Sequence, residues 1–373
     1  MRVDRITIRE IGLSLKQPFR ISSGEVTERR IMLLQLYDAS GATAWSECVA
    51  GEAPNYSPET IDTAWIAVEQ WVAKRVLGVQ FESPREVAAE LARDFRGHNM
   101  AKAGVEMGMW GLAAELAGQS LSRYIGGTRE MIEVGISLGI QSTPALLVGH
   151  ASAALDEGYR KIKIKIAPGS DFEYLRAVRE ALGPNAPIMA DANNAYTLAD
   201  TDRLRKLDDL NLMMIEQPLA SDDIVRHAEL QRALHTPICL DESITGLDRA
   251  QDMLALGSGR IINIKPGRVG GFGPSIDIHD FCLANNIPVW CGGMFESGIG
   301  RAYNVAIASL RGFTKPGDVS PSARYWHRDV VTPEWTMDAT GHTRVPLDRP
   351  GIGVDVDVER IERLTVRSAT LVA

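Results

Sequence analysis

Short apolar runs that each end in a charged residue recur at regular intervals through the middle of the chain. Three runs end at Asp191, Glu216 and Asp241 and a fourth ends at Lys265, at intervals of 25, 25 and 24 residues. A strand, a turn, a helix and a return turn occupy about 25–30 residues, so this interval predicts consecutive βα units. The pattern therefore predicts parallel strands that carry charged residues to one end of a sheet.

The βα pattern continues on both sides of these four runs. The candidate strands span Val134–Leu138, Lys161–Ile166, Pro187–Asp191, Leu212–Glu216, Pro237–Asp241, Ile261–Lys265 and Pro288–Cys291, and an eighth is expected near Gly312–Thr314. Seven βα units without a Rossmann fingerprint favour a closed (β/α)7β TIM-type barrel. A doubly wound sheet is the alternative.

The N-terminal part of the chain has a different order, with strands first and helices after them. Strands are expected over Arg5–Leu13, Ile31–Tyr37 and Ala44–Cys48, and a polar loop that carries Phe19 is expected over Lys16–Gly24. Two helices are expected to follow N-caps at Ser57 and Ser83, and a third is expected to start at Met100. This order predicts an α+β unit.

The tail is also expected to belong to this unit, because the run that begins at Gly351 has a strand-like pattern and can pair back with the N-terminal strands. We therefore expect a capping domain of residues 1–128, a modified TIM barrel of residues 129–324, and a C-terminal segment of residues 325–373 that returns to the cap.

Composition excludes several classes of protein. A net charge of −8 with no basic run argues against a nucleic-acid partner. The four cysteines show no CxxC spacing, so neither a disulfide scaffold nor a zinc site is predicted. No apolar run is long enough for a signal peptide or a membrane span. We expect a cytoplasmic enzyme with a small-molecule substrate and no membrane partner.

The acidic residues at the strand ends predict a metal site. Neighbouring strands lie about 4.8 Å apart, so Asp191, Glu216 and Asp241 can converge on one ion. Three carboxylates without His or Cys suit a hard cation, with Mg²⁺ expected and Mn²⁺ tolerated. Any one of these acids is equally well explained as a cap of the following helix. Three in register favour a metal, because their clustered negative charge requires a cation.

Lysines flank the acidic residues. Lys161, Lys163 and Lys165 alternate with isoleucines, so the lysines share one strand face and are expected to point into the barrel. A dry setting near other cations would lower the pKa of such a lysine toward the working pH, as a general base requires. Lys265 ends a strand on the opposite side of the barrel. The arrangement predicts removal of a proton α to a carboxylate from one face and its return to the other.

These residues resemble those of the enolase superfamily. With the motifs Glu216-Gln-Pro218, Asn263-Ile-Lys265 and Trp290-Cys-Gly-Gly293, the chain is similar to the muconate-lactonizing-enzyme subgroup and looks most like the o-succinylbenzoate synthase/N-succinylamino acid racemase family. The resemblance implies that Lys165 and Lys265 are the acid/base groups and that Asp191, Glu216 and Asp241 bind Mg²⁺.

The resemblance also implies a substrate pocket. Its expected residues are Lys163 and Ser137 for the substrate carboxylate, Phe19 and Tyr56 for the lid, Met294 for the apolar wall and Arg268 at a position that accompanies racemase activity. Asn193, two residues after Asp191, is expected either to orient the ligand or to cap a helix. A homo-oligomer is expected by resemblance only.

The predicted function is Mg²⁺-dependent abstraction of the α-proton of a carboxylate substrate, which gives an enolate intermediate. The enzyme would be an N-succinyl (N-acyl) amino acid racemase, an o-succinylbenzoate synthase of menaquinone biosynthesis, or both. Dipeptide epimerase and muconate-type cycloisomerase are alternatives, although epimerases of this subgroup usually carry Asp-x-Asp where this chain has Trp290-Cys-Gly-Gly293. A non-catalytic metal-binding barrel is a remote alternative, because both lysines and all three acids are retained.

Overall fold

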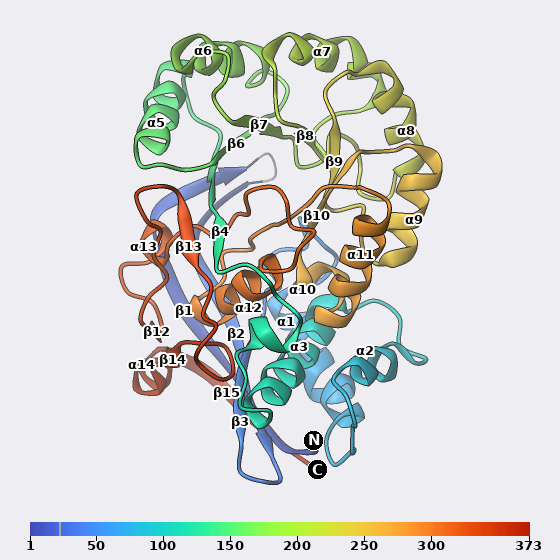
Figure 1. Ribbon diagram of the computed structural model, residues 1–373, viewed down its shortest axis with the longest axis vertical. Coiled ribbons are helices and arrows are strands. Elements are labelled where there is room, and N and C mark those ends of the chain that lie inside the picture. The colour runs from blue at the N-terminus through green and yellow to red at the C-terminus, as the bar shows by residue number, and fades with distance from the viewer. Residues whose placement is uncertain (22–23) are drawn as a thin grey trace.

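The computed structural model describes residues 1–21 and 24–373. The first and last strands of the chain belong to one antiparallel sheet, in the order β15-β1-β2-β3. Its strands are β1 (Val3–Ile21), β2 (Gly24–Asp38), β3 (Thr43–Cys48) and β15 (Thr365–Val372). The helices of this part of the chain are α1 (Ile61–Ala67), which continues as a π-helical turn over Val68–Val72 and a 3₁₀ turn over Ala73–Arg75, α2 (Arg85–Ala92), α3 (Asn99–Leu116) and α4 (Leu121–Tyr124). The two termini lie side by side at one end of the molecule (Figure 1).

Seven parallel strands form the second sheet, in the order β11-β10-β9-β8-β7-β6-β5. They are β5 (Gly135–Leu138), β6 (Lys161–Lys165), β7 (Ile188–Asp191), β8 (Ile215–Glu216), β9 (Ile238–Leu240), β10 (Ile261–Ile264) and β11 (Val289–Cys291). The segment around Phe313 and Gly317 closes the gap between the two outer strands, because Phe313 bridges Val289 and Gly317 bridges Val134 in parallel. The predicted TIM-type barrel is thus confirmed, and the closing segment includes the expected eighth strand.

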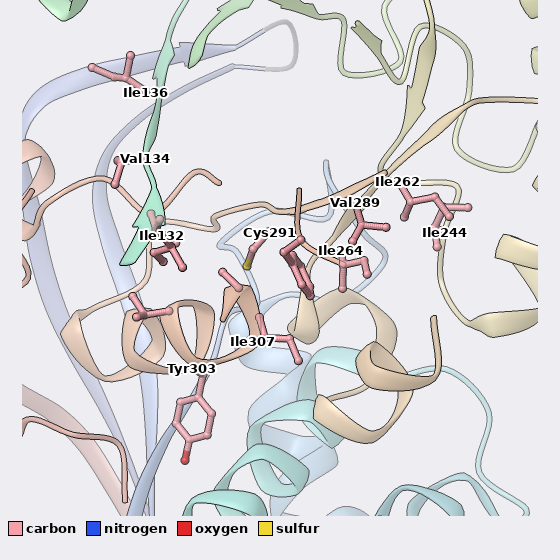
Figure 2. Packing of buried hydrophobic residues seen from close by; sticks show 14 of the residues in the cluster. Ile132, Val134, Ile136, Ile244, Ile262, Ile264, Val289, Cys291, Tyr303 and Ile307 are labelled. Carbon is pink, nitrogen blue, oxygen red and sulfur yellow. The ribbon is translucent and has the colours of Figure 1, made fainter. Parts of the chain in front are cut away.

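Helices surround the barrel strands. They are α5 (Pro144–Asp156), α6 (Phe172–Leu182), α7 (Thr201–Arg205), α8 (Ile224–Ala233), α9 (Leu247–Leu256), α10 (Pro266–Val269), α11 (Phe272–Ala284) and α12 (Gly298–Ala308), with 3₁₀ turns over Leu198–Asp200 and Lys206–Leu210. Figure 1 shows α5 to α9 along the outer rim. Figure 2 shows Ile264, Val289 and Cys291 of the strands close to Ile307 of α12, in the buried layer between strands and helices.

The C-terminal segment adds short elements before β15. They are α13 (Ser322–Tyr325), the strand pair β12 (Val331–Thr332) and β14 (Asp355–Val356), the pair β4 (Met131–Glu133) and β13 (His342–Arg344), and α14 (Val358–Leu364).

The alternation along β6 has the predicted result. Ile162, Ile164 and the following Ile166 are buried in the layer between strands and helices, whereas the three lysines point into the barrel. The barrel also contains an apolar floor, which consists of Met189, Met214, Cys239, Ile261 and Trp290. Lys161, at the start of β6, lies against Trp290 of this floor, whereas Lys163 and Lys165 line the cavity toward the strand ends.

The region predicted as a polar loop over Lys16–Gly24 is mainly strand. β1 continues through Ile21, and Phe19 pairs with Val26 across the hairpin after a register shift that begins at Ser14. The hairpin reaches the barrel, because the Ile140 backbone N–H donates to the Arg20 carbonyl oxygen at 3.0 Å. Ser22 and Ser23 of the predicted loop lie outside the described residues. The loop prediction was wrong because paired backbone groups outweigh the polar side chains of this stretch.

Two further boundaries differ from the prediction. The first helix begins at Ile61 and is capped by Thr60, whose hydroxyl accepts from the Thr63 N–H at 3.2 Å while the Thr63 hydroxyl accepts from the Thr60 N–H. This reciprocal pair displaces the predicted cap at Ser57. In the tail, the run from Gly351 supplies β14, which pairs with β12, and it is β15 that joins the N-terminal sheet.

No helix among residues 1–21 and 24–373 is long and apolar enough to cross a membrane. All four cysteines are buried as free thiols.

An ion-pair network joins β15 to the first strands. Arg367 of β15 and Arg30 of β2 both bind Glu10 and Asp62, at N–O distances of 2.5–2.9 Å. The hydrogen bond from Arg30 lowers the pKa of Asp62 to about 2. The stability from this group is therefore present above the usual aspartate pKa and is lost as the pH falls toward 2.

Asp62→Asn is expected to lower the free energy of unfolding at pH 7 by ~0.5–1 kcal/mol, a small effect because Asp62 is half exposed. Urea unfolding at pH 7 and pH 3 measures the difference, which should shrink at pH 3. Asp202→Asn on α7 is the control, since Asp202 pairs only within its helix. An equal loss of unfolding free energy at pH 7 and pH 3 would contradict the assignment of this stability to the ionised Asp62 carboxylate.

Candidate active site

Three buried carboxylates line the carboxyl ends of adjacent strands. Asp191 and Glu216 end β7 and β8 and stand opposite each other in the register, and Asp241 directly follows β9. Each side chain is at most 1% exposed. The strand ends thus bring together the three predicted metal ligands at one edge of the sheet.

Lysines from the two sides of the barrel bind these carboxylates. Lys165 Nζ lies 2.6 Å from Asp191 Oδ2, and Lys265 Nζ lies 2.8 Å from Asp241 Oδ2. Lys165 ends β6 and Lys265 follows β10, with β7, β8 and β9 between them. Gly292 gives Lys265 its room, because a Cβ there would lie 2.5 Å from the lysine Cε. The two predicted acid/base lysines therefore flank the carboxylates.

The charges of the site shift one another's pKa values. Burial raises the pKa of Glu216 well above its usual range, and the neighbouring Asp191 charge adds to this. Burial acts in the same direction on Asp191, but Lys165 and Lys163 outweigh it and lower its pKa. Burial would lower the pKa of Lys265, yet the Asp241 carboxylate raises it. The predicted lowering of a lysine pKa, made for the strand Lys161–Lys165, is confirmed for Lys161, whose pKa burial lowers. It is wrong for Lys163, because the charges of Asp318, Glu216 and Asp191 outweigh burial and raise its pKa.

The donor set fits a hard cation. All three side chains offer only oxygen, and the buried Glu216 Oε2 has no hydrogen-bond partner, whereas Oε1 accepts from Asn263 Nδ2 at 2.7 Å. Within residues 1–21 and 24–373, no three His, Cys, Asp or Glu side chains already surround a single point. Lys165 and Lys163 bind Asp191, and Lys265 and Arg268 bind Asp241.

A cavity of about 390 Å³ is lined by Lys165 and Lys265, the two lysines that bind these carboxylates. Its lining includes most of the predicted pocket: Phe19, Tyr56, Ser137, Lys163, Lys165, Asn193, Lys265 and Met294. The volume suits a small-molecule ligand. The capping sheet and the barrel therefore both contribute to the walls of one cavity.

The polar groups of the cavity have distinct partners. Asn193 Oδ1 accepts from Lys165 Nζ at 2.6 Å, and its Nδ2 donates to Glu242 at 3.2 Å. Tyr56 donates from its hydroxyl to Asp241 Oδ1 at 2.9 Å, and its ring centroid lies 4.4 Å from Lys265 Nζ. Ser137 Oγ is buried without a hydrogen-bond partner. Asn193 thus holds Lys165 in place, and Tyr56 links the cap to Lys265.

Apolar side chains form the opposite wall of the cavity. The Phe19 ring of β1 meets Phe295 edge to face, with centroids 5.0 Å apart, and Met294 lies beside it in the loop after β11. Phe19 is 7% exposed. The tip of the hairpin and this barrel loop therefore close the apolar side of the cavity together.

Two family models match the chain. Residues 147–361 match the model described as enolase C-terminal domain-like, and residues 4–126 match the model described as mandelate racemase/muconate lactonizing enzyme, N-terminal domain. The chain belongs to the enolase superfamily.

Superfamily members with known names resemble the whole chain. An o-succinylbenzoate synthase from Geobacillus stearothermophilus is 47% identical over 365 residues, which cover 98% of this chain and 96% of the relative. An N-succinylamino acid racemase from Thermus thermophilus is 45% identical over 366 residues, which cover 98% of each. A crystal structure of a superfamily member from Listeria innocua superimposes with a TM-score of 0.96 at 36% identity, covering 100% of this chain and 99% of the other. The predicted resemblance is confirmed.

Arg268 is the predicted pocket residue that lies apart from the main cavity. Its guanidinium binds Asp241 and donates from Nε to the Ile244 carbonyl oxygen at 2.6 Å, and the side chain is 4% exposed. It lines a second cavity of about 720 Å³ on the other side of Tyr56. Arg268 therefore contacts Asp241 from the side of the second cavity and not from the main cavity.

Sequence reasoning missed Asp318 and Glu242. Asp318 lines the main cavity and binds Lys163, and Glu242 accepts from Asn193. The signal for Asp318 was its place just after the expected eighth strand, where a superfamily barrel presents another strand end. Glu242 directly follows Asp241 and has no sequence signal that separates its role from that of Asp241.

Proposed function

We propose that the protein is a Mg²⁺-dependent enzyme that removes the α-proton of a carboxylate substrate. It would act as an N-succinyl (N-acyl) amino acid racemase, as an o-succinylbenzoate synthase, or as both. The observation that carries this proposal is the position of Lys165 and Lys265 on either side of three buried carboxylates and in the lining of one cavity.

Asp191, Glu216 and Asp241 would hold the metal, with Mn²⁺ as the expected substitute. Bound there, Mg²⁺ would supply positive charge beside the substrate carboxylate and make the neighbouring C–H bond more acidic. Lys163 and Ser137 would bind the substrate carboxylate at the barrel end of the cavity, since the Lys163 ammonium and the unpartnered Ser137 hydroxyl both line it.

In the racemase reaction, neutral Lys165 Nζ takes the α-proton from one enantiomer, and the Lys265 ammonium donates a proton to the opposite face of the enolate. The roles reverse for the other enantiomer. In the synthase reaction, Lys165 takes the α-proton and then assists the departure of the hydroxyl group as water, while the Lys265 ammonium stabilises the enolate. Both reactions share the first half, so one site can catalyse them.

We propose that the capping domain, residues 1–128, covers the barrel, residues 129–324, and determines which substrate the site accepts. Residues 325–373 would complete the cap. Phe19 and Tyr56 are the cap residues that support this, because they line the cavity together with the lysines of the barrel. A homo-oligomer stays a prediction.

The test is an assay of the purified protein with Mg²⁺ against a panel of N-acylated amino acids and the synthase substrate, with dipeptides and muconate included. Racemisation or dehydration at rates far above those for dipeptides and muconate supports the proposal. Turnover confined to dipeptides or muconate would assign the alternative activities. No turnover of any member would favour the non-catalytic barrel.

Phe19→Ala is expected to raise KM for N-succinylphenylalanine about tenfold while kcat changes much less, because an apolar wall of the cavity is lost but the lysines are untouched. Steady-state racemisation by polarimetry measures both constants. Phe19→Leu is the matched variant and should recover most of the affinity. A fall in kcat with an unchanged KM would contradict a role in substrate binding.

A further inference from the structure

Asp318 stands in the segment that closes the barrel. Its backbone N–H donates to the Cys291 carbonyl oxygen at 2.8 Å. The preceding residue, Gly317, forms a parallel β-bridge with Val134. The side chain is buried, yet it lines the main cavity. Asp318 therefore adds a carboxylate to the site from the strand position opposite the three proposed metal ligands.

Lys163 lies among three carboxylates and is closest to Asp318. Its Nζ is 2.5 Å from Asp318 Oδ2, compared with 3.3 Å from Asp191 Oδ2 and 3.4 Å from Glu216 Oε2. An ammonium this deep requires a compensating charge, because removal from water is unfavourable for an unpaired ion. Asp318 supplies the nearest compensating charge and is not one of the three proposed metal ligands.

Lys161 fixes the other oxygen of Asp318. Its Nζ lies 3.0 Å from Asp318 Oδ1 and 3.4 Å from the centroid of the Trp290 ring, and the side chain is 0% exposed. Gly135 makes space for it, since a Cβ at that position would lie 2.5 Å from the Lys161 Cε. Asp318 is thus held from below by one lysine while its second oxygen faces Lys163.

We infer that Asp318 is a positioning residue that draws the Lys163 ammonium toward itself, so that Lys163 makes only longer contacts of 3.3 and 3.4 Å with Asp191 and Glu216 and competes less with a cation for their oxygens. The inference rests on the proposed metal site. Without Asp318, the nearest charge partners of Lys163 would be Asp191 and Glu216, and Lys163 would compete directly with Mg²⁺ for them. Asp318 also aims Lys163 at the cavity, where it is proposed to bind the substrate carboxylate.

The test compares Lys161→Met with the double variant Lys161→Met/Asp318→Asn by calorimetric titration with Mg²⁺ alone. Asp318→Asn by itself would leave two buried ammonium groups short of charge and is liable to unfold. The double variant removes one positive and one negative charge, so the net charge of the site equals that of the wild type. Methionine is similar in length to lysine, and its thioether can replace the cation–π contact with Trp290 by a sulfur–aromatic contact.

The double variant is expected to bind Mg²⁺ about tenfold more weakly than Lys161→Met, because Lys163 would then pair with Asp191 and Glu216; the size corresponds to the loss seen when residues outside the ligand set are replaced. Its KM for N-succinylphenylalanine should rise, while kcat at saturating Mg²⁺ stays close to that of Lys161→Met. A merely structural role would instead lower the melting temperature and leave the Mg²⁺ affinity of the folded fraction unchanged.

Equal Mg²⁺ affinity in the two folded variants would overturn the inference and leave the proposed metal site intact. A wild-type protein that takes up no Mg²⁺ would overturn the metal site and the inference together. If the double variant does not fold, Asp318→Glu takes its place in the test. This variant keeps the negative charge but displaces the carboxylate by one methylene group. That variant should bind Mg²⁺ more weakly than the wild type, and equal affinity there would likewise overturn the inference.

Discussion

Lys165→Ala is expected to abolish both racemisation and dehydration, with kcat/KM reduced by about 10²–10⁴-fold or more. Lys165 Nζ lies 2.6 Å from both Asp191 Oδ2 and Asn193 Oδ1, and its side chain lines the main cavity. Alanine removes the proton acceptor, and the other lysine reaches only the opposite face. Steady-state assays of racemisation and of dehydration measure the loss.

The matched control is Lys206→Ala, which removes an exposed lysine. It should leave both activities near the wild-type level, and thermal unfolding should show that both variants are folded. Wild-type turnover by folded Lys165→Ala in both reactions would exclude Lys165 as the base and with it the proposed mechanism.

Glu216→Gln is expected to reduce turnover about 10³-fold or more and to remove the stabilisation by Mg²⁺, because one of three proposed ligands loses its charge. The metal-free variant should nevertheless be at least as stable as the metal-free wild type. Burial and the Asp191 charge raise the pKa of Glu216 above its usual 4.5, so its ionised form opposes folding at pH 7. Glutamine removes this charge and can still accept the bond from Asn263.

Thermal unfolding with excess Mg²⁺ and with a chelator measures the two effects separately. Glu229→Gln, at an exposed position of α8, is the control and should keep the full Mg²⁺-dependent increase in melting temperature. A Mg²⁺-dependent increase of wild-type size in Glu216→Gln would argue against Glu216 as a ligand.

The barrel and its central residues could be predicted because the relevant signals are local. Alternation along Lys161–Lys165 determines which side chains face inward, and the recurring interval puts Asp191, Glu216 and Asp241 at equivalent strand ends. Both features follow from the strand period and the βα repeat, without knowledge of the tertiary structure.

Other features depend on contacts between distant parts of the chain. The stretch from Lys16 reads as a polar loop, but pairing across the hairpin extends β1 through it. The Arg268 guanidinium turns toward Asp241 and away from the main cavity, and only the packing of Tyr56 and Ile244 around it determines that direction. Asp318 joins the site because the closing segment continues past the expected eighth strand as irregular backbone, whose path the sequence pattern does not predict.

The direct test of two lysines on opposite faces is α-proton exchange in D₂O with Mg²⁺ and each enantiomer of N-succinylphenylalanine, followed by proton NMR. The wild type should exchange the α-proton of both enantiomers. Lys165→Ala and Lys265→Ala should each retain measurable exchange with one enantiomer only, and with opposite ones. Exchange of the same enantiomer by both variants, or no exchange of any acylated amino acid by the wild type together with no dehydration, would contradict the account.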